Sequence, residues 1–505
     1  MRSLIFARFF LAAFCVLTLS PLRAEEAKPE APHTAPPAGV KGQASQLPAG
    51  STAQHSITLD GKQLSYKAAA DTLPLFGPKG EIAAKIFYVA YTAGNANERP
   101  VTFAFNGGPG AAAAFLHLGA LGPRIVPFSE NGAAPLRPAR LADNPDSWLA
   151  FTDLVFIDPV GTGYSRTAAG GADAEKAYWG VAKDIDSMAE AVRLWLSQNG
   201  RELAPLYLAG ESYGGFRVAG LSKRLLSMGF SVQGAVMVSP ALEFSMLYDD
   251  DYTVLPLTFV LPSLAAANAE IQGGPRAPLD AVAEAEAYAR ADYLLHLANG
   301  LKQDREAIAA VAKFTGLEPD TVSKHHGRVS AELFRREYLR RTDRELSLYD
   351  AAVSTPAPRP SERPRFDPIL DGAAAVLGPA ASSYIGTELG FKTSLEYRLL
   401  NRKISAHWDF GLKPGQQGYA GSLGSLEEAR MRNPALKILI VHGYTDLVTP
   451  FAMSGYLVSQ LRPIEGAAPA GIRVYRGGHM MYLRPASRAE LSRDARVVYG
   501  AAGAQ

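Results

Sequence analysis

The sequence contains almost no cysteine, carries almost no net charge, and has no long apolar segment beyond its first residues. Its 51 lysines and arginines stand against 49 aspartates and glutamates, a formal net charge of +2. This balance excludes the strong basic field that gathers nucleic acid. A single cysteine, Cys15, excludes a disulfide framework. The scarcity of apolar runs excludes a membrane bundle, because each span needs about 20 apolar residues.

The first residues have the pattern of a signal peptide. Two arginines precede the apolar run Phe9–Leu19, and Leu22–Ala24 ends on a small residue that suits cleavage. We expect residues 1–24 to be removed and the protein to be periplasmic or secreted, without stable membrane insertion; an uncleaved anchor is the alternative. Removal takes Cys15 with it, which excludes a thiol nucleophile and a zinc–cysteine site from the mature chain.

The rest of the chain has a globular composition, with 47% hydrophobic and 20% charged residues. Residues 25–54 are rich in proline, alanine and glycine, and we expect them to form a flexible leader. Short apolar runs then alternate with helical patterns, which predicts an α/β fold whose mostly parallel sheet is covered by helices on both faces. The expected strands are His55–Leu59, Gln63–Lys67, Ile82–Tyr91, Thr102–Phe105, Leu154–Val160, Leu206–Ala209, Gln233–Val238, Lys437–His442 and Ile472–Tyr475.

The alternation of strands and helices stops in the middle of the chain. Asp280–Leu301 and Ser330–Arg341 have helical patterns, and a proline-rich break follows. We expect this block to be an inserted, mainly helical cap over the strand ends. The predicted division is 55–240 for the first part of the core, 241–403 for the cap and 404–505 for the second part of the core.

The motif Gly210-Glu211-Ser212-Tyr213-Gly214 has the form G-x-S-x-G and occurs once. It stands directly after an expected strand and before an expected helix, which is the setting of a nucleophile elbow. This turn exposes the serine hydroxyl at a helix N-terminus, where partial positive charge stabilises an oxyanion. The alternative is a glycine-rich turn with an incidental serine.

A serine nucleophile needs a base, and the base needs an orienting acid; after this elbow they follow in the order acid, histidine. Asp446 follows the strand Lys437–His442, and His479 follows the strand Ile472–Tyr475 on a glycine-containing loop. Because the carboxyl ends of parallel strands meet at one edge of a sheet, we expect both to lie near Ser212. An aspartate that only caps its own turn is the alternative for Asp446.

Among the other histidines, His442 is the main competitor for the role of base. His442 lies within a strand pattern and is expected to be packed. His117 could line the pocket, and the cap residues His325 and His326 are expected to be solvated. His479 is therefore the predicted base.

The loop Asn106-Gly107-Gly108-Pro109-Gly110 follows another expected strand. Its glycines let backbone N–H groups turn toward one point, and in this fold one oxyanion donor comes from such a loop. We assign the amides of Gly108 and Tyr213 as the two donors. A phosphate-binding loop is excluded, because the Lys-Ser/Thr ending of a Walker motif is missing.

Together these motifs resemble the serine carboxypeptidases, a family of the α/β-hydrolase superfamily. The resemblance rests on N-G-G-P-G at 106–110, L-G-P at 121–123, N-P-D-S-W at 144–148, F-I-D-P-V-G-T-G-Y-S at 156–165, G-E-S-Y-G-G at 210–215, D-x-x-x-P at 446–450 and G-H-M at 478–480. It implies the α/β-hydrolase fold and the release of single residues from peptide C-termini, often at acidic pH. The lack of cysteine is similar to bacterial-type members.

The resemblance also implies a site for the terminal carboxylate of the substrate. In the family an asparagine like Asn106 and a glutamic acid like Glu211 hold this group, and Gly107 lies beside them. Glu211 must be protonated to donate a hydrogen bond, because two bare carboxylates repel each other. Simple packing at the elbow is the alternative for Glu211.

Several positions depart from the family pattern. Ala104 stands where a tryptophan is usual, Ala111–Ala113 where Cys-Ser-Ser is usual, and Tyr444 where an aspartate is usual. Ala120 replaces a common glutamate, so Glu211 is expected to lack an acid partner.

The sequence thus predicts acyl transfer on a peptide substrate. His479 takes the proton of Ser212, and Asp446 orients the imidazole and stabilises its charged form. We expect no metal or cofactor to take part. Two other hypotheses stay open: an esterase or acyltransferase with the same three residues, and a non-catalytic binding protein on the same fold.

Overall fold

The folded chain begins earlier than the sequence predicts. The computed structural model describes residues 42–94, 98–248, 252–274, 277, 279–301, 303–359, 366–411 and 418–501. The predicted signal peptide, 1–24, and the leader as far as residue 41 lie outside them. The short 3₁₀ helix η1 (Gln43–Gln46) and the first residues of the strand β1 (Ser51–Leu59) already fall within the predicted leader, and Ala44 and Leu47 are buried there.

Ten strands of the described chain form one sheet, in the order β1-β2-β3-β7-β4-β9-β10-β13-β14 with β8 beside β3. Their bounds are β1 (Ser51–Leu59), β2 (Lys62–Phe76), β3 (Ile82–Ala93), β4 (Val101–Phe105), β7 (Asp153–Ile157), β8 (Arg166–Thr167), β9 (Leu206–Glu211), β10 (Val232–Val238), β13 (Lys437–Gly443) and β14 (Gly471–Tyr475). The sheet is parallel from β7 to β14 and antiparallel from β1 to β7. Every predicted strand is present; the ends differ by no more than four residues except in β2, which runs to Phe76, nine residues beyond the predicted Lys67.

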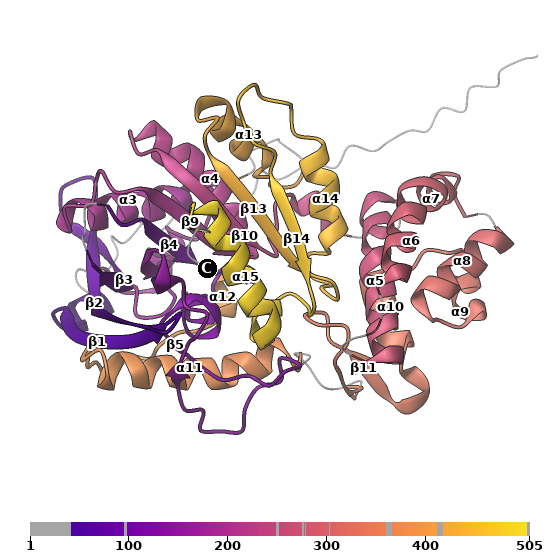
Figure 1. The fold of residues 1–505 in the computed structure, drawn as a ribbon, viewed down its shortest axis with the longest axis horizontal. Helices are drawn as coiled ribbons and strands as arrows, with labels where there is room; N and C mark the ends of the chain where they lie inside the picture. The colour runs from indigo at the N-terminus through magenta and orange to yellow at the C-terminus, as the bar shows by residue number, and fades with distance from the viewer. Residues whose placement is uncertain are drawn as a thin grey trace, which may run out of the picture. The chain divides into compact units, whose positions relative to one another are not determined.

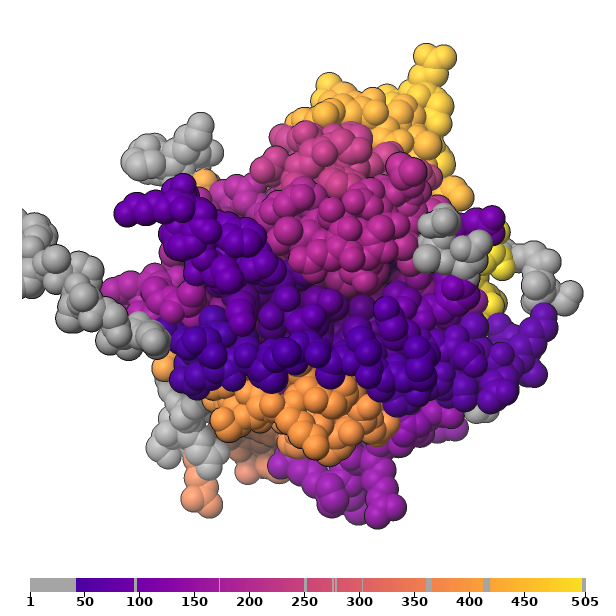
Figure 2. All heavy atoms as spheres, turned by 90° about the vertical axis from the view of Figure 1, so that its left-hand side faces the viewer, coloured from indigo at the N-terminus to yellow at the C-terminus, as the bar shows by residue number. Residues whose placement is uncertain are grey.

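Side chains alternate between two buried faces of this sheet. In β3, Tyr88 and Ala90 belong to one apolar core, whereas Phe87 and Val89 belong to the other. Helices α3 (Val181–Gln198), α4 (Tyr213–Ser227), α13 (Leu423–Arg432) and α14 (Phe451–Ser459) cover the first core, and α1 (Ala114–Leu116), α11 (Leu370–Thr387) and α15 (Pro485–Val498) cover the second (Figure 1). Figure 2 shows the first strands as an indigo band with α11 in orange below it. The predicted α/β arrangement is confirmed.

The segment predicted as one cap, 241–403, consists of two parts that pack on different faces. The first part holds α5 (Leu255–Gly273), α6 (Asp280–Tyr288), α7 (Leu294–Ala298), α8 (Arg305–Thr315), α9 (Pro319–Lys324) and α10 (Ala331–Glu337), followed by the pair β11 (Arg344–Leu346) and β12 (Ser354–Pro356). Its helix α5 packs against α14, beyond the β14 edge of the sheet (Figure 1). The second part holds α11, whose apolar residues Val376 and Leu377 complete the second core.

Short elements connect these layers. They are β5 (Arg124–Ile125), β6 (Ala142–Asp143), α2 (Ala172–Lys176), α12 (Arg402–Ala406), η2 (His117–Leu121), η3 (Trp148–Ala150), η4 (Phe244–Met246), η5 (Ala289–Tyr293), η6 (Arg340–Thr342) and η7 (Met481–Leu483). Among the described residues, no helix is both long enough and apolar enough to cross a membrane.

Candidate active site

Ser212 occupies the sharp turn between β9 and α4. Its backbone has φ 57° and ψ −123°, a conformation that residues with a side chain rarely adopt. The Ser212 N–H donates to the Val238 carbonyl at 2.9 Å, and the Ser212 carbonyl accepts from the N–H groups of Gly215 and Ala241 at 2.9 and 3.1 Å. The side chain is partly exposed. The turn therefore has the strained geometry predicted for a nucleophile elbow.

Asp446 and His479 form a buried pair on the loops that follow β13 and β14. His479 Nδ1 lies 2.9 Å from Asp446 Oδ2. The other oxygen of Asp446 accepts the N–H groups of Val448 and Thr449 at 2.8 and 2.9 Å. Asp446 thus caps its own turn and orients the histidine at the same time, so the two roles considered for it coexist.

The electrostatics of this pair favour an aspartate beside an imidazolium. His479 is 2% exposed and Asp446 is fully buried. Burial raises the pKa of Asp446, but the charge and hydrogen bond of His479 outweigh it and hold that pKa below its usual value. Burial lowers the pKa of His479, and the charge and hydrogen bond of Asp446 outweigh that effect, so this pKa is raised. The pair therefore suits a histidine that must accept a proton.

Backbone contacts hold the His479 loop on both sides. The His479 N–H donates to the Tyr349 carbonyl at 2.6 Å, and the His479 carbonyl accepts from the Ser239 hydroxyl at 2.8 Å. Tyr349 lies between β11 and β12, and its ring stands edge-on to the imidazole with 5.2 Å between ring centroids. The inserted segment therefore forms part of the histidine's surroundings.

A buried cation joins the first part of the insertion to these loops. The guanidinium of Arg484 pairs with Glu270 of α5 at 2.6 Å and with Asp350 at 2.7 Å, and all three side chains are less than a tenth exposed. Asp350 also accepts the hydroxyl of Thr445 at 2.6 Å. We call Arg484, Glu270 and Asp350 the arginine cluster; it links α5, the loop between β11 and β12, and the loop that carries the acid.

The glycine-rich loop after β4 lies directly against the elbow. A Cβ on Gly107 would stand 2.5 Å from the Tyr213 nitrogen and 2.7 Å from the Glu211 carbonyl oxygen, so a larger residue has no room. Within the described chain, the backbone N–H groups of Gly108 and Tyr213 donate no hydrogen bond. Tyr213 is the first residue of α4, where such donors have no partner inside the helix. Both amides can therefore serve a developing oxyanion.

Glu211 is buried beside the elbow, and donors engage both of its carboxyl oxygens. The Tyr482 hydroxyl donates to Oε1 at 2.9 Å, and the Asn106 side-chain amide donates to Oε2. Tyr482 stands three residues after His479. This hydrogen bond therefore joins the histidine loop to the elbow.

The pKa of the Glu211 carboxyl is raised to near neutral pH. Burial raises the pKa of Glu211 to about 7, although the charge of His479 and the donors Tyr482 and Asn106 act in the opposite direction. Below that pH the protonated carboxyl can donate a hydrogen bond to an anionic oxygen.

The competing histidines have other surroundings, although His442 lies close enough to Asp446 and His479 for their charges to act on it. His442 is buried within β13, where burial lowers its pKa to about 4. His117 is buried: its Nε2 lies 2.6 Å from the Tyr91 hydroxyl and its ring stacks on Phe156, so it packs beside the second core. His326 bonds to Gln303 beside α9, and its neighbour His325 is exposed.

Two residues near the site were not found from the sequence. Tyr482 is the first polar side chain after His479, and its position in that loop was a signal that could have found it. Tyr349 belongs to an insertion without a recognisable motif, and nothing in the sequence connects it with His479.

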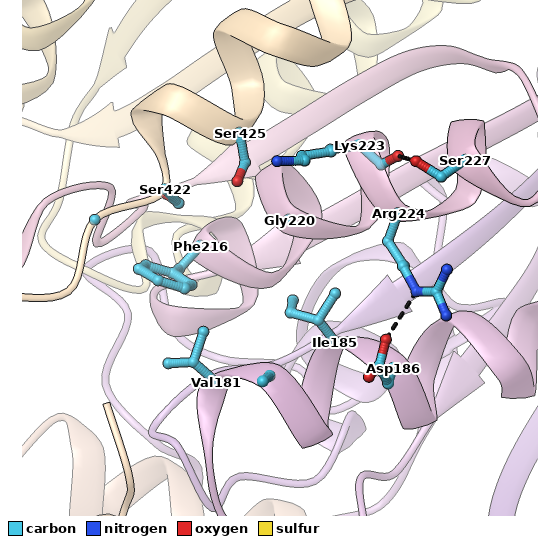
Figure 3. Close-up of a pocket in the computed structure, with 12 residues that line it drawn as sticks. Val181, Ile185, Asp186, Phe216, Gly220, Lys223, Arg224, Ser227, Ser422 and Ser425 are labelled. Carbon is cyan, nitrogen blue, oxygen red and sulfur yellow. Dashed lines mark hydrogen bonds and ion pairs between the residues drawn. The ribbon is translucent and has the colours of Figure 1, made fainter. Parts of the chain in front are cut away.

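A groove runs along α4, lined by residues of α3, α4 and the segment that leads into α13. It has a volume of about 450 Å³ and lies between α3, α4 and the start of α13 (Figure 3). Its floor is apolar, with Val181, Ile185 and Phe216, and its basic residues Lys223 and Arg224 are paired with acidic side chains. None of the predicted catalytic residues is among its described lining residues.

Comparisons with known proteins find similarity to carboxypeptidases. Residues 79–234 match the model of the serine carboxypeptidase family. The chain is 32% identical over 133 residues to the pheromone-processing carboxypeptidase kex1 of Sclerotinia sclerotiorum, across 26% of this chain and 19% of that protein. It is 29% identical over 150 residues to the retinoid-inducible serine carboxypeptidase of Rattus norvegicus, across 28% of each chain. This chain thus covers less than a third of the length of these relatives.

A solved structure extends the likeness from this segment to the fold. The crystal structure of the prohormone-processing carboxypeptidase Kex1Δp from Saccharomyces cerevisiae superposes with a TM-score of 0.50. The superposition covers 86% of this chain and 91% of that one, at 13% sequence identity. Through its residues 79–234 the chain is a relative of the serine carboxypeptidase family, and it carries the α/β-hydrolase fold.

Proposed function

We propose that this protein is a serine-type carboxypeptidase, which releases residues from the C-terminus of peptides. The observation that carries the proposal is the 2.9 Å hydrogen bond between His479 and Asp446, on loops that Tyr482 ties to the elbow of Ser212. The family match of residues 79–234 supports it.

The proposed reaction is acyl transfer through Ser212. Its Oγ attacks the scissile carbonyl carbon while His479 Nε2 takes the hydroxyl proton, and Asp446 stabilises the imidazolium. The amides of Gly108 and Tyr213 donate to the tetrahedral oxyanion, and each such donor is worth about 3 kcal/mol. The imidazolium then protonates the departing amine. The same histidine afterwards takes a proton from the water that hydrolyses the acyl-enzyme.

Preference for the chain end is assigned to Asn106, Gly107 and Glu211. The Asn106 amide and a protonated Glu211 can each donate to the substrate carboxylate, and Gly107 belongs to the same loop. An ionised Glu211 repels that carboxylate. The preference for a free C-terminal carboxylate over its amide is therefore expected to be strongest below the Glu211 pKa of about 7.

The proposed place of action is outside the cytoplasm, in the periplasm or the medium. The support is the pattern of residues 1–24, in which arginines, a short apolar run and a small residue succeed one another. Fractionation of cells that produce the full chain, with N-terminal sequencing of the product, tests this part.

A peptide digestion tests the activity. The purified protein is incubated with a pool of peptides, each present as a free acid and as a C-terminal amide, at about pH 5 and about pH 8. We expect a ladder of products shortened from the C-terminus, mainly from the free acids, and the preference for free acids over amides should be stronger at the lower pH. The control is Ser212→Ala, which should keep the fold and give no products.

Each other outcome contradicts the proposal in a different way. Internal cleavage, or equal rates for acids and amides, contradicts recognition of the chain end. Hydrolysis of a blocked amino-acid ester without any peptide cleavage points to an esterase. Failure of a fluorophosphonate to label Ser212 in the folded protein points to a non-catalytic member of the fold.

A further inference from the structure

The side chain that holds Glu211 in this chain is a tyrosine. The Tyr482 hydroxyl donates to Glu211 Oε1 at 2.9 Å, and Tyr482 is fully buried. The other oxygen accepts from Asn106. Every hydrogen bond to this carboxyl from the described chain thus comes from a neutral donor, and no second acid shares a proton with it.

The backbone near Ala120 makes room for the tyrosine ring. A Cβ on Gly119 would stand 3.0 Å from a ring carbon of Tyr482, so the ring lies against the chain where Gly119 has no side chain. Ala120 is buried and offers no polar side chain. The Tyr482 ring, which extends from η7, therefore lies next to Ala120. At Ala120 the sequence predicted that an acid partner of Glu211 is missing.

We propose that Tyr482 is a positioning residue that holds the Glu211 carboxyl toward the substrate and sets the pH above which the site rejects a free C-terminal carboxylate. The inference rests on the proposed function and names how that site is regulated. A hydroxyl that donates to a carboxyl stabilises the ionised form more than the protonated form. Tyr482 therefore draws Glu211 toward ionisation at a lower pH than burial alone would allow.

Other charges near Glu211 act on the same equilibrium. The titratable groups involved are His479 and Asp446 from the loops after β14 and β13, Tyr482 of η7, and Tyr349 between β11 and β12. A charged His479 favours the ionised Glu211, and Asp446 opposes it. Burial raises the pKa of both tyrosines, so they stay neutral over the working range. Tyr482 is thus a neutral donor that the loss of one hydroxyl group, in Tyr482→Phe, can remove.

The test compares Tyr482→Phe with the wild type. The ratio of kcat/KM for a blocked dipeptide to that for its C-terminal amide is measured against pH. This ratio removes the titration of His479, which affects both substrates. In the wild type it should fall as pH rises through about 7. In Tyr482→Phe the fall should move upward by about one pH unit, because a hydrogen bond to a charged group is lost.

Two further variants test this result: a matched control at another tyrosine, and a replacement of Tyr482 that should shift the pH of the fall in the opposite direction. Tyr475→Phe removes a hydroxyl that donates to Asp494 at 2.6 Å, and it should leave the pH of the fall unchanged. Replacement of Tyr482 by 3,5-difluorotyrosine keeps the ring and makes a stronger donor, so the fall should move to lower pH. This second probe applies even if Tyr482→Phe fails to fold.

A third variant identifies the titrating group. Glu211→Gln keeps a neutral side chain at every pH, so its ratio should show no fall, and adding Tyr482→Phe should not restore one. An unchanged fall in both Tyr482 variants would overturn the role of Tyr482 while leaving the carboxypeptidase proposal intact. A wild-type ratio near one at every pH would overturn recognition of the chain end itself, and the inference with it.

Discussion

Replacement of Gly107 by alanine should slow catalysis about a hundredfold in a protein that still folds. The added Cβ would stand 2.5 Å from the Tyr213 nitrogen and 2.7 Å from the Glu211 carbonyl oxygen, whereas ordinary contacts begin at 3.4 Å. These neighbours are backbone atoms of the elbow, which no rotamer change can move aside. The loop must therefore retreat by about 1 Å, because packed interiors leave no slack, and it carries the Gly108 amide with it.

The size of the effect follows from this displacement. A misplacement of about 1 Å costs about 10²-fold in rate, and overpacking of this kind costs about 1–3 kcal/mol of stability. The loss should appear in kcat, because the Gly108 amide serves the oxyanion of the transition state. Steady-state kinetics on a chromogenic peptide, together with denaturant unfolding, measure the two effects separately.

Gly386→Ala is the matched control. Gly386 lies in α11, and apart from its chain neighbours and the backbone of its own helix no heavy atom stands within 4 Å of its added Cβ. This variant should leave kcat unchanged and raise the free energy of unfolding by up to about 1 kcal/mol, since alanine favours a helix. A wild-type kcat in Gly107→Ala would refute the reasoning that the loop must touch the elbow for catalysis.

Three further predictions concern the acid, the elbow and the arginine cluster. Asp446→Asn should lower kcat by about 10⁴-fold with little change in the fold, because the wrong imidazole tautomer is then favoured; a loss below tenfold in steady-state kinetics contradicts the role of the pair. Ser212→Gly should be more stable than Ser212→Ala by about 1 kcal/mol, since only glycine adopts φ 57° without strain; equal unfolding free energies argue against a strained elbow. Arg484→Met removes the buried cation that pairs with Glu270 and Asp350 and should cost about 3–5 kcal/mol; a urea titration with an unchanged midpoint rejects this.

The sheet could be predicted because most of its strands are short apolar runs bounded by turn residues in the sequence. The helices α5 and α11 could not be predicted in the same way. Both contain a proline, Pro262 and Pro379, at which sequence rules end a helix. Their buried residues also lie on more than one face, so the spacing typical of an amphipathic helix is weak. Tertiary packing therefore stabilises α5 and α11 as helices, although their local sequence does not predict them.

The site could be predicted as far as chain order determines it. Ser212, Asp446 and His479 each follow a parallel strand, and that places all three at one edge of the sheet. The contacts of Tyr482 and Tyr349 depend on which side chains meet across distant loops, and no motif encodes that. The same limit explains His117, for which burial within an aromatic cluster could not be distinguished from a place beside the substrate.

The arginine cluster bears on any attempt to shorten this chain. A minimal version that deletes the helices from α5 to α10 would remove Glu270 yet keep Arg484 and Asp350. A guanidinium previously shared by two carboxylates would then face one, at a newly opened surface beside the loop that holds His479. The segment from α5 to α10 therefore cannot simply be deleted. A shortened chain will need another acidic residue in place of Glu270 to keep the loop that holds His479 ordered.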